Sequence, residues 1–340
     1  MKNHPYTSSI FIKTWLSHFI SEGSEVKFDA IEGPVFIKKK IPPIYINSGS
    51  NLTLQAFYKV INSTFNSLKK KVLVIYDVPN YFKIENTLKS DFLKIIIVKE
   101  YIGFLIDLSN YKSLNEYLNY KFNSKKRGQF RSYIKKLENS FNISYQMFYG
   151  EINREEYEYL FNEMHSLLVK SFSYKKIKNR KLIPENFAFL KEVTYKLILE
   201  KQACLFVIYN DKIPIGISMN YNADGILFGD STVYDLNYSK FNIGIIGLMK
   251  QIEWCISNQI NIYDFSKGYF PYKKRWCNKE YHFEHHVIYD SKSLKSNTTA
   301  FLYSNFLKLK QYLREHPFRT FLKERVFIKK KVRKVINDSN

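Results

Sequence analysis

Chemically active side chains are concentrated in one stretch of the sequence, residues 261–276. Apolar and polar residues alternate up to Phe265 and the alternation stops at Gly268, which is typical of a buried strand and its end. Asp264 lies inside this strand. Tyrosine, basic and tryptophan side chains follow the glycine: Tyr269, Tyr272, Lys273, Lys274, Arg275 and Trp276. The stretch therefore predicts a strand that delivers a carboxylate, phenols and cations to a cleft.

The elements that precede this stretch are predicted as a dense β region and one helix. Strands are expected at Ala203–Tyr209, Ile215–Tyr221 and Ile226–Ser231, with turns at Asn210–Pro214 and Asn222–Gly225. Because Asp-Gly is a strong hairpin signal, the three strands should form an antiparallel meander. Asp230 falls at the end of its third strand. A helix then runs to Asn258 and leads to the strand Asn261–Phe265.

The start of that helix has the composition of an anion site. Asn242 is a natural N-cap, and Gly244 and Gly247 leave the first turn free of bulky side chains. Backbone N–H groups at such a helix start can meet an anion directly. Close packing of the helix on a sheet is the alternative use of the two glycines.

A second basic segment lies at residues 114–137, which have the spacing of two helices joined at Asn123-Ser124, with Ser124 as N-cap. Lys125, Lys126, Arg127 and Arg131 fall in the first two turns of the second helix. Cations there oppose the helix dipole, and a bound anion would offset that cost. A solvated basic face is the alternative.

The first 110 residues read as an α+β unit without a catalytic constellation. The expected elements are an amphipathic helix within residues 1–25, strands at Val26–Ile31 and within Gly33–Pro43, a helix at Asn51–Leu68, and strands at Lys71–Tyr76, Phe92–Lys99 and Ile102–Asp107. Between this unit and the meander we expect a strand at Ile143–Phe148, helices at Asn153–Phe172 and Pro184–Glu200, and a Lys-rich loop at 173–184 that is long enough for a substrate lid. His165 lies beside the apolar face of the first of these helices, as a structural or substrate-facing histidine.

The C-terminal part is predicted as a strand at Tyr281–Tyr289, a helix at Thr298–Leu313 and a basic tail. His282, Glu284 and His286 share one strand face, but without a further nearby ligand no metal site is predicted. The tail from His316 carries spaced apolar residues among many cations, which is the pattern of a helix on an anionic membrane surface. A solvated or docked terminal helix is the alternative.

The composition indicates a basic, cytoplasmic protein. The 340 residues carry 53 basic and 31 acidic side chains, a net charge of +22, which attracts nucleic acid, anionic lipid or a phosphate-rich cofactor. A solvated, lysine-rich surface without a specific partner is the alternative. Three widely spaced cysteines predict neither a zinc site nor a disulfide framework and fit a reducing compartment. No N-terminal run is apolar enough for a signal peptide or a membrane span.

The order of strands, glycine-containing helix start, helix and strand, followed by Asp264-Phe265, Gly268, Tyr272-Lys273 and Trp276, resembles the GCN5-related N-acetyltransferase (GNAT) superfamily. It is most similar to the branch described as CelD/BioF2-like acetyltransferases, and the basic patch Ser124–Arg131 also matches that branch. The likeness covers about residues 105–290. The N-terminal part fits a degenerate first half of a double GNAT fold, an arrangement shared with the FemABX transferases.

This resemblance implies an α+β fold with a mostly antiparallel central sheet, flanked by helices. It implies three parts: a degenerate lobe at 1–110, the acetyltransferase lobe at 111–290, and a C-terminal helix with the basic tail at 291–340. One departure concerns the pyrophosphate loop, usually Gln/Arg-x-x-Gly-x-Gly/Ala. Here, in Phe241–Gly247, one glycine matches and the second is shifted, so the cofactor site is weaker than in a standard member.

The resemblance also implies the chemistry. Acyl-CoA would lie between the splayed strands Ile226–Ser231 and Asn261–Phe265, with its pyrophosphate on Asn242, Ile243, Gly244 and Gly247 and with Lys240 adding charge. An amine would attack the thioester, and a backbone N–H of the first strand would stabilise the oxyanion. Tyr272 is the preferred general acid and Tyr269 the second choice, with Asp230 and Asp264 as candidate bases. Lys273, Lys125, Arg127, Arg131 and His165 are assigned to substrate binding, as is Trp276, for which a packing role is the simpler alternative.

The expected activity is acyl transfer from acetyl-CoA or another acyl-CoA to an amino sugar or a surface-polysaccharide precursor. The first alternative is a FemABX-like transferase that uses aminoacyl-tRNA, which the positive charge would suit. The second is a basic protein without enzymatic activity that binds nucleic acid or a membrane surface.

Overall fold

The structure, a computed structural model, describes residues 4–20, 23–49, 52, 53, 55–61, 64–82, 84, 90–175 and 179–315. Its helices are α1 (Ser9–Phe19), α2 (Leu114–Lys121), α3 (Ser124–Ser140), α4 (Arg154–Lys175), α5 (Pro184–Leu199), α6 (Ile243–Ser257), α7 (Pro271–Trp276) and α8 (Leu294–Glu315). Short 3₁₀ helices are η1 (Pro5–Thr7), η2 (Phe65–Leu68), η3 (Arg180–Leu182) and η4 (Leu236–Phe241).

The strands are β1 (Glu25–Val26), β2 (Ile31–Glu32), β3 (Phe36–Lys38), β4 (Tyr45–Asn47), β5 (Lys59–Val60), β6 (Val72–Pro79), β7 (Leu93–Asp107), β8 (Ile143–Phe148), β9 (Ala203–Asn210), β10 (Ile213–Ala223), β11 (Ile226–Tyr234), β12 (Ile262–Lys267) and β13 (Lys279–Asp290). All but β2 and β5 form one sheet in the order β1-β3-β4-β6-β13-β7-β12-β11-β10-β9-β8. Among the described strands, only β4·β6 and β11·β12 pair in parallel. The expected α+β fold with a mostly antiparallel sheet is confirmed.

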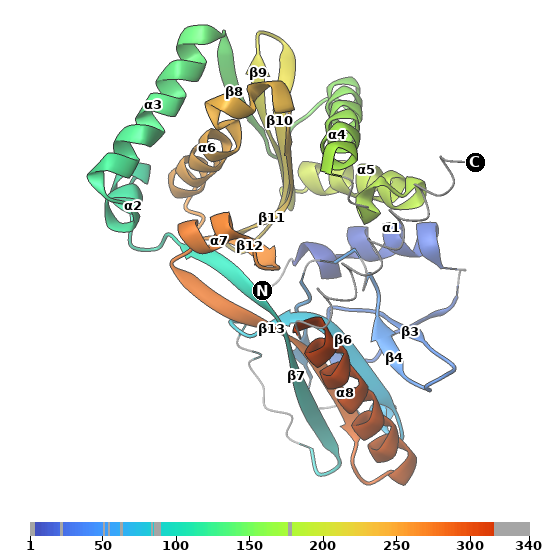
Figure 1. Cartoon of the computed structure of the whole chain (residues 1–340). Coiled ribbons are helices and arrows are strands. Elements are labelled where there is room, and N and C mark those ends of the chain that lie inside the picture. The colour runs from blue at the N-terminus through green and yellow to red at the C-terminus, as the bar shows by residue number, and fades with distance from the viewer. Residues whose placement is uncertain are drawn as a thin grey trace, which may run out of the picture.

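The sheet has two halves, which are visible in Figure 1. In the half formed by β8 to β11, helices α4 and α5 cover one face and α2, α3 and α6 cover the other. The apolar residues of these helices recur at helical spacing, so each helix buries one stripe on the sheet. The predicted meander and the predicted helices at 153–172 and 184–200 are confirmed as β9 to β11, α4 and α5.

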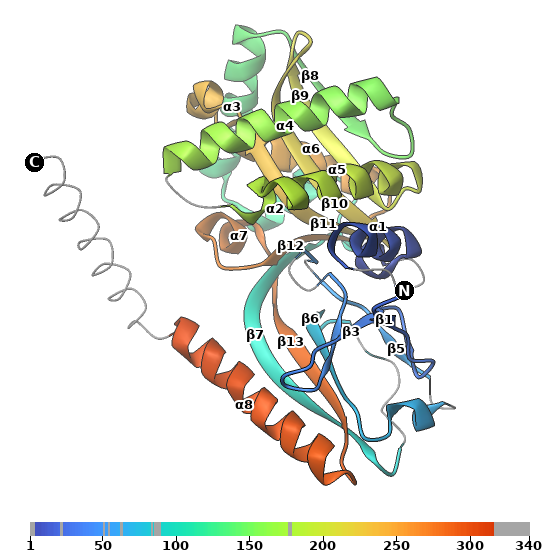
Figure 2. The ribbon, with the colours of Figure 1, turned by 90° about the vertical axis from the view of Figure 1, so that its right-hand side faces the viewer.

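The other half is built on β6, β13 and β7, with α8 on one face of these strands (Figure 2). Strand β13 returns from the C-terminal part of the sequence and lies between β6 and β7. Helix α1 packs on α5, so the N-terminal segment reaches the half formed by β8 to β11. The boundaries expected at 110 and 290 stay a prediction.

Several predicted elements of the N-terminal part are wrong. Residues 55–61 are not helical, and β5 and η2 replace the helix expected at Asn51–Leu68. Ala56, Tyr58 and Val60 are buried at a spacing of two, so packing on the sheet overrides the helical pattern. The strand expected at Val26–Ile31 is two short strands, β1 and β2, and the two strands expected between Phe92 and Asp107 are the single strand β7.

Two further expectations need correction. Asn123, not Ser124, is the N-cap of α3, because its side chain accepts a hydrogen bond from the N–H of Lys126. Helix α4 extends to Lys175 and η3 begins at Arg180, so the loop expected at 173–184 is largely helical where it is described. Helix α7 follows Gly268 in a stretch for which the sequence predicts no element. The basic tail from His316 lies outside the described residues, and in the described part of the chain no helix is long and apolar enough to cross a membrane.

One glycine of the central strands is required by packing. Gly103 of β7 lies directly opposite Tyr281 of β13, and a Cβ atom at Gly103 would come within 3.0 Å of three atoms of the tyrosine ring. The ring of Tyr281 therefore fills the space that a side chain would take. Its hydroxyl donates a hydrogen bond of 2.8 Å to Asp264.

We expect Gly103→Ala to lower the free energy of unfolding by about 1–3 kcal/mol, because the rigid ring of Tyr281 has to move. Gly128→Ala is the matched control, since a Cβ atom there meets nothing within 4 Å. In the interior of α3 it should be neutral or stabilise by about 0.5–1 kcal/mol. Urea unfolding of the two variants measures both, and a Gly103→Ala protein as stable as the parent would contradict the packing role.

Candidate active site

The centre of the candidate site is the place where β11 and β12 separate. Their parallel register runs from Ile226 opposite Ile262 to Phe228 opposite Asp264. Beyond it the strands enclose a cavity of about 350 Å³, which is also bordered by α4, η3 and α7. Its wall consists of Leu168, Phe172, Asn179, Lys181, Gly229, Asp230, Ser231, Thr232, Tyr263, Phe265, Ser266, Lys267, Phe270, Tyr272 and Lys273. We call it the splay cavity.

Lys273 is the buried cation of the splay cavity. Only 6% of the residue is exposed, and its ammonium group donates to the carbonyl oxygens of Lys267 at 3.0 Å and Ser266 at 3.4 Å. Burial lowers the pKa of Lys273 to about 8, against the attraction of Asp264, which raises it. The side chain is therefore charged at neutral pH and loses its proton in the mildly alkaline range.

The two candidate acids of the sequence stretch separate in space. Tyr272 lines the splay cavity, and its ring meets Phe265 edge to face at 5.9 Å. About half of Tyr272 (49%) is exposed; burial of the rest, and next the nearby Tyr234, raises the pKa of Tyr272, so its hydroxyl keeps its proton at neutral pH. Tyr269 does not line the cavity. Its ring lies against Phe104 at 6.0 Å and most of it is exposed.

Asp264 is fully buried and lies outside the lining of the splay cavity. Its carboxylate accepts hydrogen bonds from Gln55 Nε2 and Tyr81 Oη at 2.6 Å each, from Tyr281 Oη at 2.8 Å, and from the backbone N–H of Ser266 at 2.6 Å. Burial raises the pKa of Asp264, and these hydrogen bonds oppose the rise. The same bonds occupy the lone pairs that a general base would need.

Asp230 lies in the wall of the splay cavity and is held by Lys181. The Lys181 ammonium is 2.5 Å from Asp230 Oδ2, and it also donates to the Asp230 carbonyl oxygen at 3.0 Å and to Ser231 Oγ at 2.5 Å. The Asp230 side chain is almost completely buried. A carboxylate in this position accepts a proton only if the ion pair with Lys181 opens.

The predicted pyrophosphate residues share one short stretch, η4 and the start of α6. Asn242 has left-handed backbone angles, φ 58° and ψ 39°, and its side chain makes no capping hydrogen bond. At Gly244 a Cβ atom would lie 3.1 Å from the ring of Tyr234, and at Gly247 it would lie 3.3 Å from Ile208. Gly247 is thus packed on the sheet. Ile243 is buried, and the Lys240 ammonium lies over the ring of Phe241.

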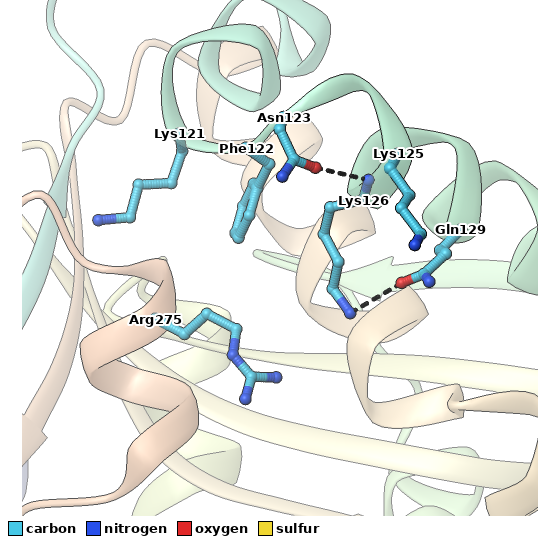
Figure 3. A pocket seen from close by; sticks show the side chains of 7 residues that line it. All are labelled: Lys121, Phe122, Asn123, Lys125, Lys126, Gln129 and Arg275. Atoms are coloured by element: carbon cyan, nitrogen blue, oxygen red, sulfur yellow. Dashed lines mark hydrogen bonds between the residues drawn. The ribbon is translucent and has the colours of Figure 1, made fainter.

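A second cavity, of about 430 Å³, collects cations between α2, α3 and α7. We call it the cationic pocket. Figure 3 shows its residues, Lys121, Phe122, Asn123, Lys125, Lys126, Gln129 and Arg275. None of the described residues that line it carries a carboxylate. Lys126 donates to Gln129 at 3.0 Å, and Lys121 donates to the carbonyl oxygen of Cys277.

The other residues assigned from the sequence lie outside both cavities. Arg127 donates to the carbonyl oxygen of Phe122 at 2.6 Å, and Arg131 is exposed on α3. Trp276 is buried with its ring stacked on Phe130 at 5.2 Å, which matches the packing alternative. The His165 ring lies 4.5 Å from that of Phe187. In the part of the chain that the structure describes, no group of three or more His, Cys, Asp and Glu side chains could hold a metal ion.

Comparisons with known proteins identify the family. Residues 124–274 match the model of an acetyltransferase (GNAT) domain. The chain therefore contains a GNAT domain, which extends over residues 124–274. It is an N-acyltransferase, which argues against a binding protein without enzymatic activity. The family description names no branch, so the CelD/BioF2-like assignment stays a prediction, and no curated protein sequence matches the chain.

Solved structures show the same fold over most of the chain. FemX has a TM-score of 0.53 at 10% identity, over 83% of this chain and 91% of its own. The C-terminal domain of a protein assigned as a lysylphosphatidylglycerol synthetase, from Agrobacterium fabrum, has a TM-score of 0.52 at 7% identity, over 90% and 96%. A conserved protein of unknown function from Bacteroides thetaiotaomicron has 0.51 at 9% identity, over 84% and 91%. These matches cover both halves of the sheet and confirm the double GNAT arrangement.

Sequence reasoning missed the partners that hold the two carboxylates. Gln55, Tyr81 and Tyr281 come from three distant segments, and no local pattern marks them as neighbours of Asp264. Lys181 lies in the segment that was expected to form a lid, and only its basic character gave a signal. The sequence shows Arg275 as a cation of the stretch 261–276. It does not indicate that Arg275 lies beside the junction of α2 and α3, because that position depends on residues 271–276 forming the helix α7.

Because Lys273 is buried, we expect the free energy of unfolding to depend on the protonation of this side chain. Because its folded pKa of about 8 lies below the ordinary 10.5, burial of the charge costs stability below pH 8, and this cost disappears as pH rises toward the unfolded pKa. Lys273→Met removes the charge. Its stability relative to the parent should therefore fall by about 2 kcal/mol between pH 7 and pH 10, at about 1.4 kcal/mol per pKa unit.

Urea unfolding of both proteins at the two pH values measures this difference. Lys273→Met also loses the two hydrogen bonds to carbonyl oxygens, but this loss is the same at both pH values and cancels when the two stability differences are compared. Lys274→Met, on the exposed side of the same helix, controls for removing a lysine from α7. A stability difference between Lys273→Met and the parent that does not change with pH would refute the buried-cation assignment.

Proposed function

We propose that the protein transfers an acyl group from an acyl-CoA, acetyl-CoA in the simplest case, to the amine of an amino sugar or surface-polysaccharide precursor in the cytoplasm. The observation that carries the proposal is the splay cavity. It opens where a parallel strand pair separates, and it is lined by a protonated phenol, Tyr272, and a buried cation, Lys273. The amino-sugar acceptor rests on the resemblance to the CelD/BioF2-like branch.

The reaction needs three things from the protein. The amine nitrogen attacks the thioester carbonyl carbon, the carbon–sulfur bond breaks, and the amide and a thiol are formed. A backbone N–H of β11, beside Gly229, and the charge of Lys273 stabilise the negative oxygen of the intermediate. Tyr272 gives its proton to the leaving thiolate, and a base takes the proton of the attacking ammonium.

Asp230 and Asp264 are the two candidates for the base. Asp230 borders the splay cavity but is paired with Lys181, and Asp264 is enclosed by four donors. An amine that arrives uncharged needs a base only after attack. Of the two carboxylates, Asp230 is the better candidate, because it lines the cavity and its cationic partner Lys181 comes from a separate element, the 3₁₀ helix η3.

The cationic pocket suits a phosphate group of the substrate. Helix α7 presents Tyr272 and Lys273 to the splay cavity and Arg275 to the cationic pocket, so both cavities border the same helix. Lys125, Lys126 and Arg275 lie around a space without a carboxylate, where a phosphate would satisfy all three charges. The start of α6, with Lys240, Asn242, Ile243, Gly244 and Gly247, remains the predicted place of the CoA pyrophosphate.

A FemX-like transfer from aminoacyl-tRNA is the second candidate. The double GNAT arrangement shared with FemX and the cations of the cationic pocket favour it. A thiol-release assay with acetyl-CoA and amino-sugar nucleotides separates the two functions. Thiol release supports CoA as donor, whereas CoA that neither binds nor reacts, together with transfer from charged tRNA, would reject the acyl-CoA proposal in favour of tRNA.

Tyr272→Phe should lower kcat by about 10²-fold with little change in KM, because it removes the proton donor and keeps the ring. In the parent, kcat/KM should fall above about pH 8 as Lys273 loses its proton. Lys273→Met should have low activity, and its kcat/KM should not show this decrease above pH 8. Tyr159→Phe, an exposed tyrosine of α4, is the matched control. A Tyr272→Phe enzyme with parental kcat would exclude Tyr272 as the acid.

Removing positive charge from the cationic pocket should weaken the binding of a phosphate-bearing substrate. Lys125→Ala combined with Lys126→Ala should raise KM for a phosphate-bearing substrate about tenfold at low salt, leave kcat within about twofold, and weaken the salt dependence of KM. Lys135→Ala combined with Lys136→Ala, on the exposed side of α3, removes the same charge elsewhere. Equal effects of the two pairs would show that only the overall charge matters and that the pocket has no specific role.

A further inference from the structure

Helix α8 has an inner face that is fixed to the sheet. Ala300, Ser304, Leu307 and Gln311 are buried, and the helix lies along β13 and β7. Near its end, Arg314 forms an ion pair of 2.5 Å with the buried Glu100 of β7. Figure 2 shows α8 on the outside of its half of the molecule, away from α4 and α6. The outer face of α8 therefore has a defined direction.

That outer face is apolar along the second half of the helix. Leu302, Phe306, Leu309 and Leu313 follow one another at intervals of four, three and four residues, and they are 63%, 54%, 55% and 54% exposed. This spacing places them in one stripe along the helix. Phe301 and Tyr312, which are 60% and 59% exposed, widen the stripe on one side. Scattered apolar side chains are common on protein surfaces, but a continuous stripe marks an interaction site.

The charges beside the stripe are all positive. At about 100° per residue, Lys308 and Lys310 fall on opposite margins of the stripe, and both are exposed. Within the bounds of α8 the sequence has one acidic residue, Glu315, which is the last residue of the helix. The sequence that follows, residues 316–340, carries eight Lys or Arg and two acidic residues. A partner of this face must accept apolar side chains in its centre and cations on both sides.

We propose that α8 is a docking surface for an anionic lipid membrane, on which it lies parallel to the surface. Leucine and phenylalanine side chains enter the boundary between head groups and acyl chains, and the flanking lysines meet anionic head groups. A second copy of the chain fits less well, because in a two-fold pairing of α8 helices the margins would bring lysines together without an acidic partner. The proposal does not depend on the donor or the acceptor of the transfer reaction.

The test is sedimentation of the full chain with vesicles of phosphatidylcholine, with and without phosphatidylglycerol, at low salt. Binding should require phosphatidylglycerol. Leu302→Gln combined with Leu309→Gln should lower the partition coefficient at least about tenfold. Leu199→Gln combined with Ile213→Gln removes two exposed apolar side chains from the other half of the molecule and should bind like the parent. Residues 316–340 are present in every variant, so their contribution cancels.

The charge part is tested by Lys308→Glu combined with Lys310→Glu, which should weaken binding more than Lys135→Glu combined with Lys136→Glu on α3. Leu309→Cys carrying an environment-sensitive fluorophore gives a readout independent of sedimentation. Its emission should shift to the blue only with anionic vesicles, whereas the same label at Ile213→Cys should not shift.

Four results would overturn the proposal. The first is parental vesicle binding by the Leu302→Gln and Leu309→Gln pair. The second is equal binding to vesicles without phosphatidylglycerol. The third is a dimer in sedimentation velocity that this pair dissociates, which would assign the face to a second copy. A label at position 309 that is already blue-shifted without vesicles would likewise assign it to a segment of the chain itself.

Discussion

The two halves of the sheet meet at one buried carboxylate, that of Asp264. A carboxylate without exposure is stable only if strong donors surround it. Here the donors come from separate segments: Gln55 from the N-terminal part, Tyr81 from the turn after β6, Tyr281 from β13, and the backbone N–H of Ser266 from the same strand. Losing one donor would leave charge unsatisfied in the interior, so the halves are held in one relative position.

The same residue shapes the splay cavity. Its hydrogen bond to the N–H of Ser266 accompanies a left-handed residue, φ 60° at Ser266, and a shift of register between β12 and β7. The bulge turns β12 away from β11 at the last paired residue. Asp264 thus supports the reaction site from behind, through the backbone, while Tyr272 and Lys273 meet its contents. This division explains how the aspartate can matter for the site and yet lie outside the cavity lining.

The sequence predicts what depends on local pattern. The meander, the helix before β12 and the strand with Asp264 follow from alternation, hairpin signals and helical spacing, and Tyr272, Lys273 and Asp230 do line one cavity. Contacts over long sequence distances are not predicted, because nothing near Gln55 or Tyr81 marks them as donors to Asp264. Packing against the sheet also decides the conformation of residues 55–61, where the apolar spacing suggested a helix.

Buried charge also fixes the orientation of α8. Glu100 has no exposed side-chain surface, and its carboxylate meets His285 at 3.3 Å and Arg314 at 2.5 Å. Burial alone would raise the pKa of Glu100, but the hydrogen bonds and charges of His285 and Arg314 lower it, so the carboxylate is ionised and needs its cation. Arg314 can reach Glu100 only from the inner side of α8. Rotating the helix to bury Leu302 and Leu309 would break this ion pair in the interior, which costs more than the two leucines would gain. The apolar stripe is therefore outside because of a charge on the opposite side of the helix.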